Sequence, residues 1–336
     1  MIYNLKKIKS YELELSVTLD KSDLDYYIKE AQKYLANDLK IKGFRQGKVP
    51  AEIAKDKLDK KEVLETAFDI AFKQSFSDML IKEKLDLINA GKFEIKENSA
   101  ERVVYAVSLV VFPEFKLGSY KNIKIDKRSI SVSSEEIDKT IEFIRNSKKS
   151  NGIIPELNDD FAKGLGNFEN LEQLRENISG GLKEEEEIKE SQRVQSAILD
   201  EIANDTKVEI PPILIDRQLD QMMLDLDADL HGQGMELGLF LAKIKKTSDE
   251  LRNEWKSKAG ALVKKALILK EIAKKESIRV EPEEIKGKVE QFLGGFMNIG
   301  EAQKSIDLPK LSDQIRQILL NQKVLAFLER EAAYIS

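Results

Sequence analysis

The period of the apolar residues near the amino terminus constrains the fold more than any other feature of this sequence. Over Leu13–Leu19 apolar and polar residues alternate, as in a strand with one buried face. From Ser22 to Leu39 apolar residues instead recur every three or four positions, as on one face of an amphipathic helix. The chain is therefore predicted to begin with a strand that leads directly into a helix.

The same two periods return further along the first third of the chain. Pro50, a favoured first-turn residue, is followed by a short helical pattern and then by a longer one. The longer helix has one expected buried face, formed by Leu64, Phe68, Ala71, Ser75 and Met79. Alternation resumes at Phe93 and Ile95, and again over Val103–Val111. Residues 1–115 thus predict an α+β domain with helices on one side of a small antiparallel sheet.

Beyond residue 115 strand patterns give way to helical ones. Residues 116–150 are interpreted as an extended linker and a linker helix, which Ser134 is expected to cap and which ends near Ser147. A polar stretch with the turn signal Asn151-Gly152 marks the next boundary. Residues 151–336 are predicted to be all-α, because helical patterns follow one another there. These patterns cover Glu187–Ala203, Pro212–Leu230 and Thr247–Glu276, and further helices start at Pro282 and Pro309.

The helix predicted over Thr247–Glu276 has the clearest start signal. Thr247 and Glu250 have the spacing of a capping box. One apolar face is expected, formed by Leu251, Trp255, Ala259, Leu262 and Ala266.

Composition and charge narrow the classes of function. Charged residues make up 34% of the 336 and aromatic residues only 7%, which favours long solvated helices over a compact enzyme-like globule. The absence of cysteine excludes disulfides, thiolate nucleophiles and cysteine metal sites. Residues 1–150 carry 29 Lys and Arg against 25 Asp and Glu, whereas residues 151–336 carry 26 against 35. The two parts are therefore expected to have different partners.

Targeting signals are not evident in the sequence. No apolar stretch approaches the roughly 18 residues of a membrane span, and the amino terminus lacks the apolar core of a secretory signal. We therefore expect a cytoplasmic protein with no membrane partner.

A basic loop stands between the first two predicted helices. Residues 40–61 hold eight Lys and Arg against three Asp and Glu. Gly43 and Gly47 allow a tight reversal, which would project Phe44, Arg45 and Lys48 away from the flanking helices. Composition alone leaves two interpretations open, a solvated turn or a contact with nucleic acid or an acidic protein.

The residues of this loop carry a resemblance to a known family. The string Gly43-Phe44-Arg45-Gln46-Gly47-Lys48-Val49-Pro50 resembles the G-F-R-x-G-K-x-P signature of bacterial trigger factor, a family of ribosome-associated chaperones. The resemblance implies docking beside the nascent-chain exit, where the loop would meet ribosomal protein and RNA. Gln46 stands where many members have a second basic residue. The implied contact residues are Gly43, Phe44, Arg45, Gln46, Gly47, Lys48 and Pro50.

The second half resembles the same family. Residues 155–161 (PELNDDF) and 263–285 (VKKALILKEIAKKESIRVEPEEI) are similar to the start and the central part of its helical domain. The resemblance implies an elongated multidomain protein, in which an α+β ribosome-binding domain is followed by an all-α, arm-bearing chaperone domain.

One domain of full-length members is expected to be missing. In the family a prolyl isomerase domain stands before the helical domain, but Ser147 and Pro155 are too close together here to hold any domain. We therefore predict its absence between about residues 148 and 155, by natural loss or by deliberate deletion. No catalytic residue, enzymatic activity or cofactor is expected for this chain.

Two glycine-interrupted apolar stretches are candidates for binding unfolded clients. Methionine is flexible and polarizable, so that it can meet varied side chains. The alternative, that these residues only pack one arm helix on another, stays open. The candidates are Met222, Met223, Met235, Leu237, Phe240, Phe292, Phe296 and Met297.

Other polar residues are assigned structural roles. His231, the only histidine, is expected to complete a helix end rather than to bind a metal. The acidic run Glu184–Glu187 is expected to form a solvated helical face, and no metal site is predicted.

The leading hypothesis is an ATP-independent chaperone that docks at the ribosomal exit site. It would shield new polypeptides from misfolding and aggregation and assist their folding and export. Its expected partners are the ribosome, unfolded or nascent polypeptides and, when free, a second copy of itself. Two alternatives are a periplasmic-type folding chaperone and a non-catalytic helical scaffold with a fixed partner.

Overall fold

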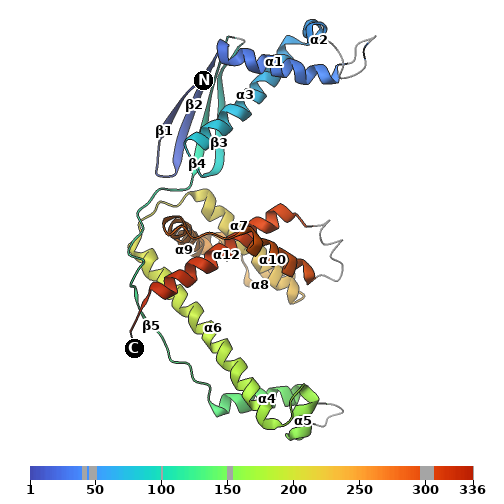
Figure 1. The fold of residues 1–336 in the computed structure, drawn as a ribbon, viewed down its shortest axis with the longest axis vertical. Helices are drawn as coiled ribbons and strands as arrows, with labels where there is room; N and C mark the ends of the chain where they lie inside the picture. Colours follow the sequence, from blue (N-terminus) through green and yellow to red (C-terminus); the bar gives the residue numbers. More distant parts are fainter. Residues whose placement is uncertain (40–43, 45–50, 100, 150–153, 296–305, 336) are drawn as a thin grey trace. The chain divides into compact units, whose positions relative to one another are not determined.

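The computed structural model describes residues 1–39, 44, 51–99, 101–149, 154–295 and 306–335 (Figure 1). These residues form two compact units. The first comprises Met1–Lys116 and Val208–Val263, and the second comprises Leu117–Lys207 and Lys264–Ser336. The domain limits at residues 115 and 150 stay a prediction.

The first unit contains a four-stranded antiparallel sheet in the order β1-β2-β4-β3. Alternation of apolar residues produces its two central strands, since Leu15 lies opposite Val107 and Val17 opposite Tyr105. The three predicted strands are confirmed as β2 Glu12–Asp20, β3 Leu87–Asn98 and β4 Arg102–Val111. The sequence did not predict the edge strand β1 Ile2–Lys7.

Three helices lie between β2 and β3 in the chain: α1 Lys21–Asp38, α2 Ala51–Lys57 and α3 Lys60–Lys82. Helices α1 and α3 lie against one face of the sheet (Figure 1). Within this core the hydroxyl groups of Ser75 and Tyr105 are 2.8 Å apart, and Ser75 also donates to the carbonyl of Ala71. The predicted face of α3 is buried except at Leu64, which is half-buried, and it also includes Val63 and Ala67.

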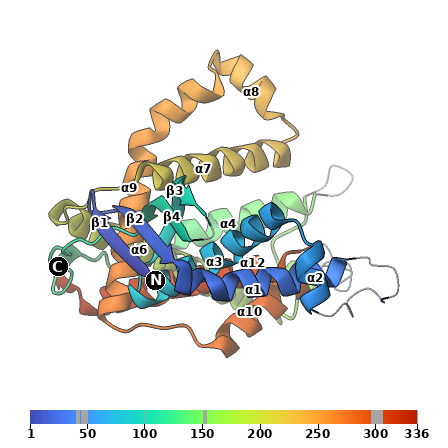
Figure 2. The same cartoon turned by 90° about the horizontal axis from the view of Figure 1, so that it is seen from above.

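The first unit also contains α7 Pro212–Gly232, α8 Leu237–Ile244 and the start of α9 Ser248–Lys275. Figure 2 shows α8 joined to α7 by a short turn and leading into α9. The capping box that opens α9 is confirmed, because Glu250 accepts the backbone N–H of Thr247 at 2.8 Å and the Thr247 hydroxyl accepts that of Glu250 at 3.2 Å.

The predicted apolar face of α9 is wrong in its second half. Leu251 and Ala259 are buried as expected and Trp255 is half-buried, but Leu262 and Ala266 are exposed. The buried positions there are Val263, Leu267 and Ile268. Val263 and Leu267 continue the steps of four that join Leu251, Trp255 and Ala259, so the buried face runs one position later than the predicted Leu262 and Ala266.

The second unit is mostly helical. It contains β5 Lys124–Asp126, α4 Ser134–Ser147, α5 Asp159–Leu165, α6 Leu171–Asp205, α10 Pro282–Gly294, α12 Leu308–Glu331 and β6 Ala333–Ile335. Pro282 and Pro309 lie in the first turns of α10 and α12, as predicted. The sequence did not predict β6, which pairs in parallel with β5.

Two helix starts in this unit differ from the predictions. Ser133, not Ser134, is the cap of α4, since its hydroxyl accepts the N–H of Glu136 and the Glu136 carboxylate accepts the N–H of Ser133. Helix α6 begins at Leu171 rather than near Glu187, because Asn170 caps it by accepting the N–H of Gln173 at 2.9 Å. The acidic run Glu184–Glu187 lies exposed on α6, as predicted.

Candidate functional site

The predicted docking loop lies mainly outside the described residues. The structure describes Phe44, whose side chain is 40% exposed. Its exposure is compatible with contact to a partner, and the docking role stays a prediction. The other predicted contact residues lie outside the part that the structure describes: Gly43, Arg45, Gln46, Gly47, Lys48 and Pro50.

The helices that flank this loop are held by a small apolar cluster. Ala31 of α1, Leu58, and Val63 and Ala67 of α3 are buried together. Asp59 caps α3, because its carboxylate accepts the backbone N–H of Lys61 at 2.7 Å and that of Glu62 at 3.1 Å. Four lysines of this frame are exposed, together with the carboxylates of Asp56, Asp59 and Glu62: Lys55, Lys57, Lys60 and Lys61.

Helix α8 is the most unusual apolar element of the first unit. It has one charged residue, Lys243, yet none of its side chains is buried. Leu239 is 65% exposed, and Leu224 on α7 is 63% exposed. A helix of this composition is ordinarily expected inside a protein. The predicted candidates of this region are all half-buried and offer part of their surface to solvent: Met222, Met223, Met235, Leu237 and Phe240.

The turn between α7 and α8 is closed by backbone hydrogen bonds. The N–H of Met235 donates to the carbonyl of Leu230 at 2.9 Å, and that of Gly234 donates to the carbonyl of His231 at 3.0 Å. Gly234 has a φ of +74°, which glycine adopts without steric cost. His231 lies in the last turn of α7, where its Nδ1 is 2.8 Å from the carbonyl oxygen of Asp227, but the C-cap itself is Gln233.

A second apolar surface is a hollow of about 310 Å³ between α10 and α12. Phe292 on α10 is 47% exposed and Ile318 on α12 is 55% exposed. Phe296 and Met297, predicted beside Phe292, lie outside the described residues. The sequence predicted a helix that starts at Pro309 but did not predict that Ile315 and Ile318 on it line a hollow. Its lining is Lys288, Gln291, Phe292, Ile315, Ile318, Leu319 and Gln322.

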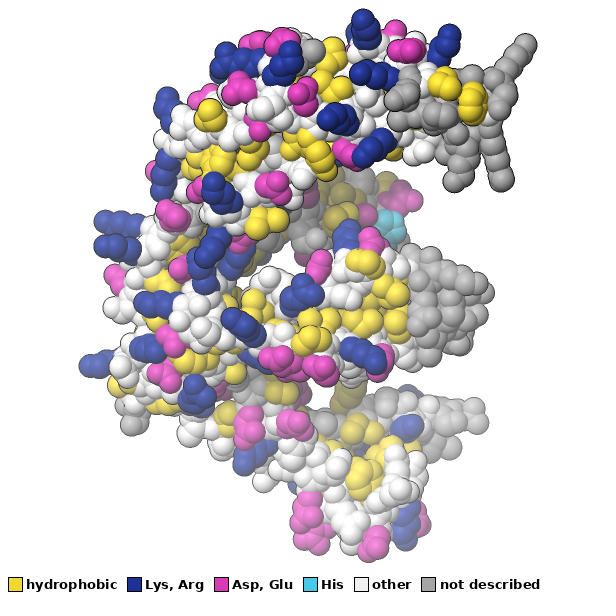
Figure 3. Space-filling view, turned by 45° about the horizontal axis from the view of Figure 1, so that its top comes forward, with side chains coloured by type: hydrophobic (Ala, Val, Ile, Leu, Met, Phe, Trp, Pro, Cys, Tyr) yellow, Lys and Arg dark blue, Asp and Glu magenta, His cyan; other side chains and the backbone are white. Residues whose placement is uncertain are grey.

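Charged side chains lie between apolar ones on the face shown in Figure 3. Such interspersion lets a protein expose apolar groups and remain soluble. No group of three or more His, Asp or Glu side chains that could hold a metal ion occurs in the described part of the chain. None of the helices described there is long and apolar enough to cross a membrane.

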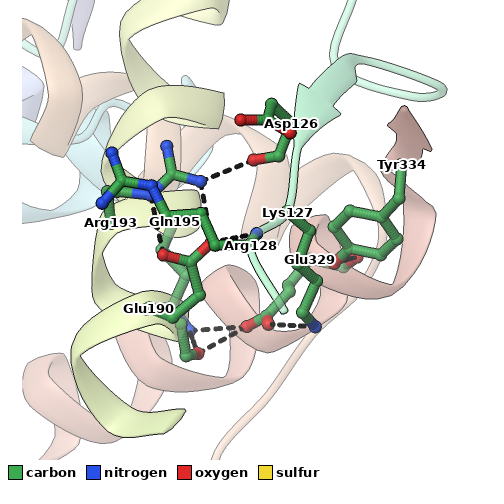
Figure 4. Close-up of polar contacts among 9 residues, drawn as sticks. Asp126, Lys127, Arg128, Glu190, Arg193, Gln195, Glu329 and Tyr334 are labelled. Carbon is green, nitrogen blue, oxygen red and sulfur yellow. Dashed lines mark hydrogen bonds and ion pairs between the residues drawn. The ribbon is translucent and has the colours of Figure 1, made fainter. Parts of the chain in front are cut away.

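A polar network fixes the extended linker onto the helices of the second unit (Figure 4). The buried carboxylate of Glu190 accepts hydrogen bonds from Arg193 Nε and from the backbone N–H of Arg128, both at 2.8 Å. The Arg193 guanidinium also donates to the carbonyl of Asp126. The bonds from Arg193, followed by that from Arg128, lower the pKa of Glu190 to about 2. The network therefore stays charged at neutral pH.

The carboxyl-terminal end joins the same network. Glu329 of α12 accepts hydrogen bonds from Ser191 at 2.8 Å and from Gln195 at 3.0 Å. Lys127 lies 3.6 Å from the Glu329 carboxylate and over the ring of Tyr334. The linker, α6 and α12 are thereby held together, and α12 forms one side of the hollow.

The fold defines a class of proteins in which an α+β region precedes a mostly helical one, and exposed apolar surfaces of this kind mark contacts with other macromolecules. Family models identify the members of that class to which the chain is similar. The model described as bacterial trigger factor protein matches residues 1–144, and the one for its C-terminus matches residues 170–329. The chain belongs to the bacterial trigger factor family, which supports a chaperone role.

Individual relatives agree with this assignment. The trigger factor of Clostridium kluyveri is 22% identical over 98% of this chain and 98% of its own length. That of Clostridioides difficile is 24% identical over 87% and 90%. A solved structure from a study of promiscuous substrate recognition by the trigger factor chaperone covers 98% of this chain and 99% of its own, with a TM-score of 0.55 and 18% identity. The predicted family and fold class are confirmed.

Proposed function

We propose that this protein is an ATP-independent chaperone that shields newly made polypeptides from misfolding and aggregation and assists their folding and export. The observation that carries the proposal is the exposed apolar helix α8. Each apolar client side chain that becomes well buried there contributes on the order of 1–2 kcal/mol. Such contacts are weak enough to be lost as the client buries its own apolar surface, so that release needs no nucleotide.

The methionines support binding of varied clients. Met222 and Met223 lie half-buried on α7, and Met235 lies half-buried in the turn before α8. Unbranched, polarizable side chains repack around different partners at little cost.

Docking at the ribosome is the second part of the proposal. The exposed Phe44 and the exposed lysines of α2 and the start of α3 support it. Loop residues Arg45 and Lys48 would meet phosphate or carboxylate groups at the tunnel exit. The protein would then act in the cytoplasm, and it would associate with a second copy when it is off the ribosome.

We further propose that this chain lacks the prolyl isomerase domain. The two family models leave residues 145–169 between them. The alignment with the C. kluyveri protein spans 422 positions, whereas this chain has 336 residues, so the relative holds a surplus large enough for a small domain. A proline isomerisation assay on a short peptide should therefore show no rate enhancement, and a clear enhancement would refute this part.

Suppression of aggregation tests the chaperone role. Light scattering of a denatured protein on dilution should fall when the full chain is present in molar excess. Leu224→Ser with Leu239→Ser should weaken this suppression, whereas Ile2→Ser with Ile81→Ser, at positions 67% and 73% exposed outside α7 and α8, should not. No suppression by the unaltered chain, or a fixed stoichiometric partner in place of varied clients, would favour a helical scaffold.

Co-sedimentation with ribosomes tests docking. Phe44→Ala with Arg45→Glu and Lys48→Glu should abolish it. Lys73→Glu with Lys96→Glu makes the same change in charge at exposed positions of α3 and β3 and should leave it intact. Binding should also weaken as salt is raised.

A further inference from the structure

The short turn that joins α7 to α8 (Figure 2) is a closed hydrogen-bonded motif. The N–H of Met235 donates to the carbonyl of Leu230, and the N–H of Gly234 donates to that of His231. With Gly234 in the left-handed conformation, these two bonds define a Schellman motif. Apolar side chains at its first and last positions commonly pack together. Here Leu230 is 6% exposed and Met235 is half-buried, so both fit that role.

The chemistry of its closing residue sets this turn apart. Two other helices in the described ranges end in the same motif with an apolar closing residue. Leu85 closes α3 by donating to the carbonyl of Leu80, and Ile278 closes α9 by donating to that of Ala273. Both are half-buried hydrocarbon side chains, which do not react with mild oxidants. The turn between α7 and α8 is instead closed by the thioether of Met235, whose sulfur does react.

Sulfur in this chain is confined to methionine, because the sequence has no cysteine. Met79 lies in the sheet core with no exposed surface, where an oxidant does not reach it. Met222, Met223 and Met235 are half-buried, so a small oxidant can reach part of each side chain. Of these three, Met235 also closes a turn, so that its oxidation can change the backbone as well as the surface.

We propose that Met235 is a reversible oxidation site, and that conversion of its thioether to a sulfoxide opens the turn between α7 and α8 and lowers client capture on α8. The oxidant class is hydrogen peroxide. The sulfur lone pair forms an S–O bond to one peroxide oxygen, the O–O bond breaks, and the other oxygen leaves as water with the proton released. Sulfur thereby loses two electrons, and the peroxide gains them. The part of the proposal that concerns clients rests on the chaperone function.

A sulfoxide is disfavoured in this turn because it is polar and strongly hydrated. At Met235 it draws the side chain toward water and removes the apolar contact that the motif gives to Leu230. Helix α8 depends on this turn, since none of its side chains is buried and an eight-residue helix is marginal by itself in water. Opening the turn therefore loosens α8, whose exposed Leu239 belongs to the proposed client surface.

Amide hydrogen exchange of the full chain, followed by mass spectrometry, tests the site. Dilute hydrogen peroxide should place a sulfoxide on Met235 and none on Met79. Exchange at residues 237–244 should become about five- to ten-fold faster, which corresponds to the loss of a half-buried methionine contact. Methionine sulfoxide reductases for both sulfoxide epimers, with a thiol as reductant, should restore slow exchange.

Binding of a fluorescent apolar peptide tests the consequence for clients. Its affinity for the full chain, measured by anisotropy, should fall on oxidation in proportion to the fraction of chains in which α8 is still in place. The reductases should restore this affinity together with slow exchange.

Variants locate the effect. Met235→Leu keeps an apolar side chain without sulfur and should make α8 insensitive to peroxide. Met235→Gln is a permanent polar replacement and should speed exchange in α8 without peroxide. The matched control, Met222→Leu with Met223→Leu, removes the other two half-buried thioethers of this region and should respond to peroxide as the unaltered chain does.

The outcomes separate the oxidation site from the function beneath it. Unchanged exchange in α8 when Met235 carries a sulfoxide, or an equal response of Met235→Leu to peroxide, would overturn the proposal. If exchange responds and peptide affinity does not, the oxidation site stands and its effect on clients is overturned. Failure of the peptide to bind the untreated chain would overturn client binding, while exchange in α8 still tests the oxidation site.

Discussion

The sheet of the first unit and helix α8 are built from the same kinds of residue and expose them very differently. Leu15 and Val17 on β2 have no exposed surface, whereas Leu239 on α8 is 65% exposed. β2 pairs with strands on both sides and carries α1 and α3 on one face. The part of the chain that the structure describes leaves every residue of α8 at least partly exposed. Burial is thus decided by the presence of a partner layer and not by composition.

Backbone hydrogen bonds at its end, rather than burial in a core, fix the position of α8. Lys245 ends the helix in the left-handed conformation, and the N–H of Lys246 donates to the carbonyl of Leu241 at 3.0 Å. An eight-residue helix is marginal by itself in water. The comparison therefore distinguishes a region that stabilises the protein from one whose apolar side chains are kept for partners, and four substitutions examine it.

The largest effect is expected in the sheet core. Leu15→Ala should lower the free energy of unfolding by about 2–5 kcal/mol, because it removes buried methyl groups and leaves a cavity. Ile2→Ala on the edge strand β1, where the side chain is 67% exposed, should change it by less than about 0.5 kcal/mol. Denaturant unfolding followed by circular dichroism measures both. Equal losses would mean that the edge strand is covered in solution.

The next effect concerns the charged network of the second unit, which stabilises by polar contacts. The pKa of Glu190 falls from 4.5 to about 2 on folding, so its contribution is fully present above pH 4.5 and is lost as pH falls toward 2. Because Arg193 is about one-third exposed, we expect only about 1–3 kcal/mol. Glu190→Gln should remove this amount at pH 7 and should flatten the loss of stability between pH 4.5 and 2.

A matched control is available for that change on the same helix. Glu187→Gln alters an exposed member of the acidic run, 4.0 Å from Lys183, and should leave the pH dependence of unfolding as it is in the unaltered chain. If both variants behave alike, the network of Figure 4 adds nothing that a solvated carboxylate does not.

Elements with a strong local pattern could be predicted from the sequence, and elements set by distant neighbours could not. The alternation on β2 and β4 and the capping box at Thr247 each specify structure within a few residues. Leu171, Leu174, Ile178 and Leu182 have helical spacing, but Gly180-Gly181 interrupts this stretch and the acidic run follows it, so the first half of α6 was missed. The three-residue strand β6 forms only because β5 lies beside it.

The candidate surfaces show the same limit. The sequence identified Leu237, Phe240 and Phe292 as candidates for client binding. Whether other elements bury these side chains depends on the tertiary fold, which a local sequence pattern does not specify. The hollow between α10 and α12 depends on two segments that are brought together by the fold. Likewise, Leu262 and Val263 are both apolar and adjacent on α9, and only the fold shows that Val263 is the buried one.

A smaller effect is expected from loss of the hydrogen bond between the buried hydroxyl groups of Ser75 and Tyr105 in the sheet core. Tyr105→Phe removes the 2.8 Å contact between two buried hydroxyl groups, while Ser75 keeps its 2.6 Å bond to the carbonyl of Ala71. A loss of about 1 kcal/mol in unfolding free energy is therefore expected. Tyr26→Phe, at a position 55% exposed, should have no measurable effect. A loss at Tyr105 as large as that of Leu15→Ala would show that the hydroxyl pair, rather than apolar packing, dominates this core.

The smallest effect on stability is expected on α8, and it decides the comparison. Leu239→Ala should change the free energy of unfolding by at most about 0.5 kcal/mol, because two-thirds of the side chain is already in water. Leu219→Ala on α7, where the side chain is 4% exposed, should cost about 2 kcal/mol or more. For the affinity toward an apolar peptide the order should reverse. Leu239→Ala should weaken binding more than Leu219→Ala, because the exposed Leu239 is expected to contact the peptide and the buried Leu219 is not. If Leu239→Ala destabilised the protein as much as Leu219→Ala, α8 would lie in a core in solution and could not serve as a binding surface.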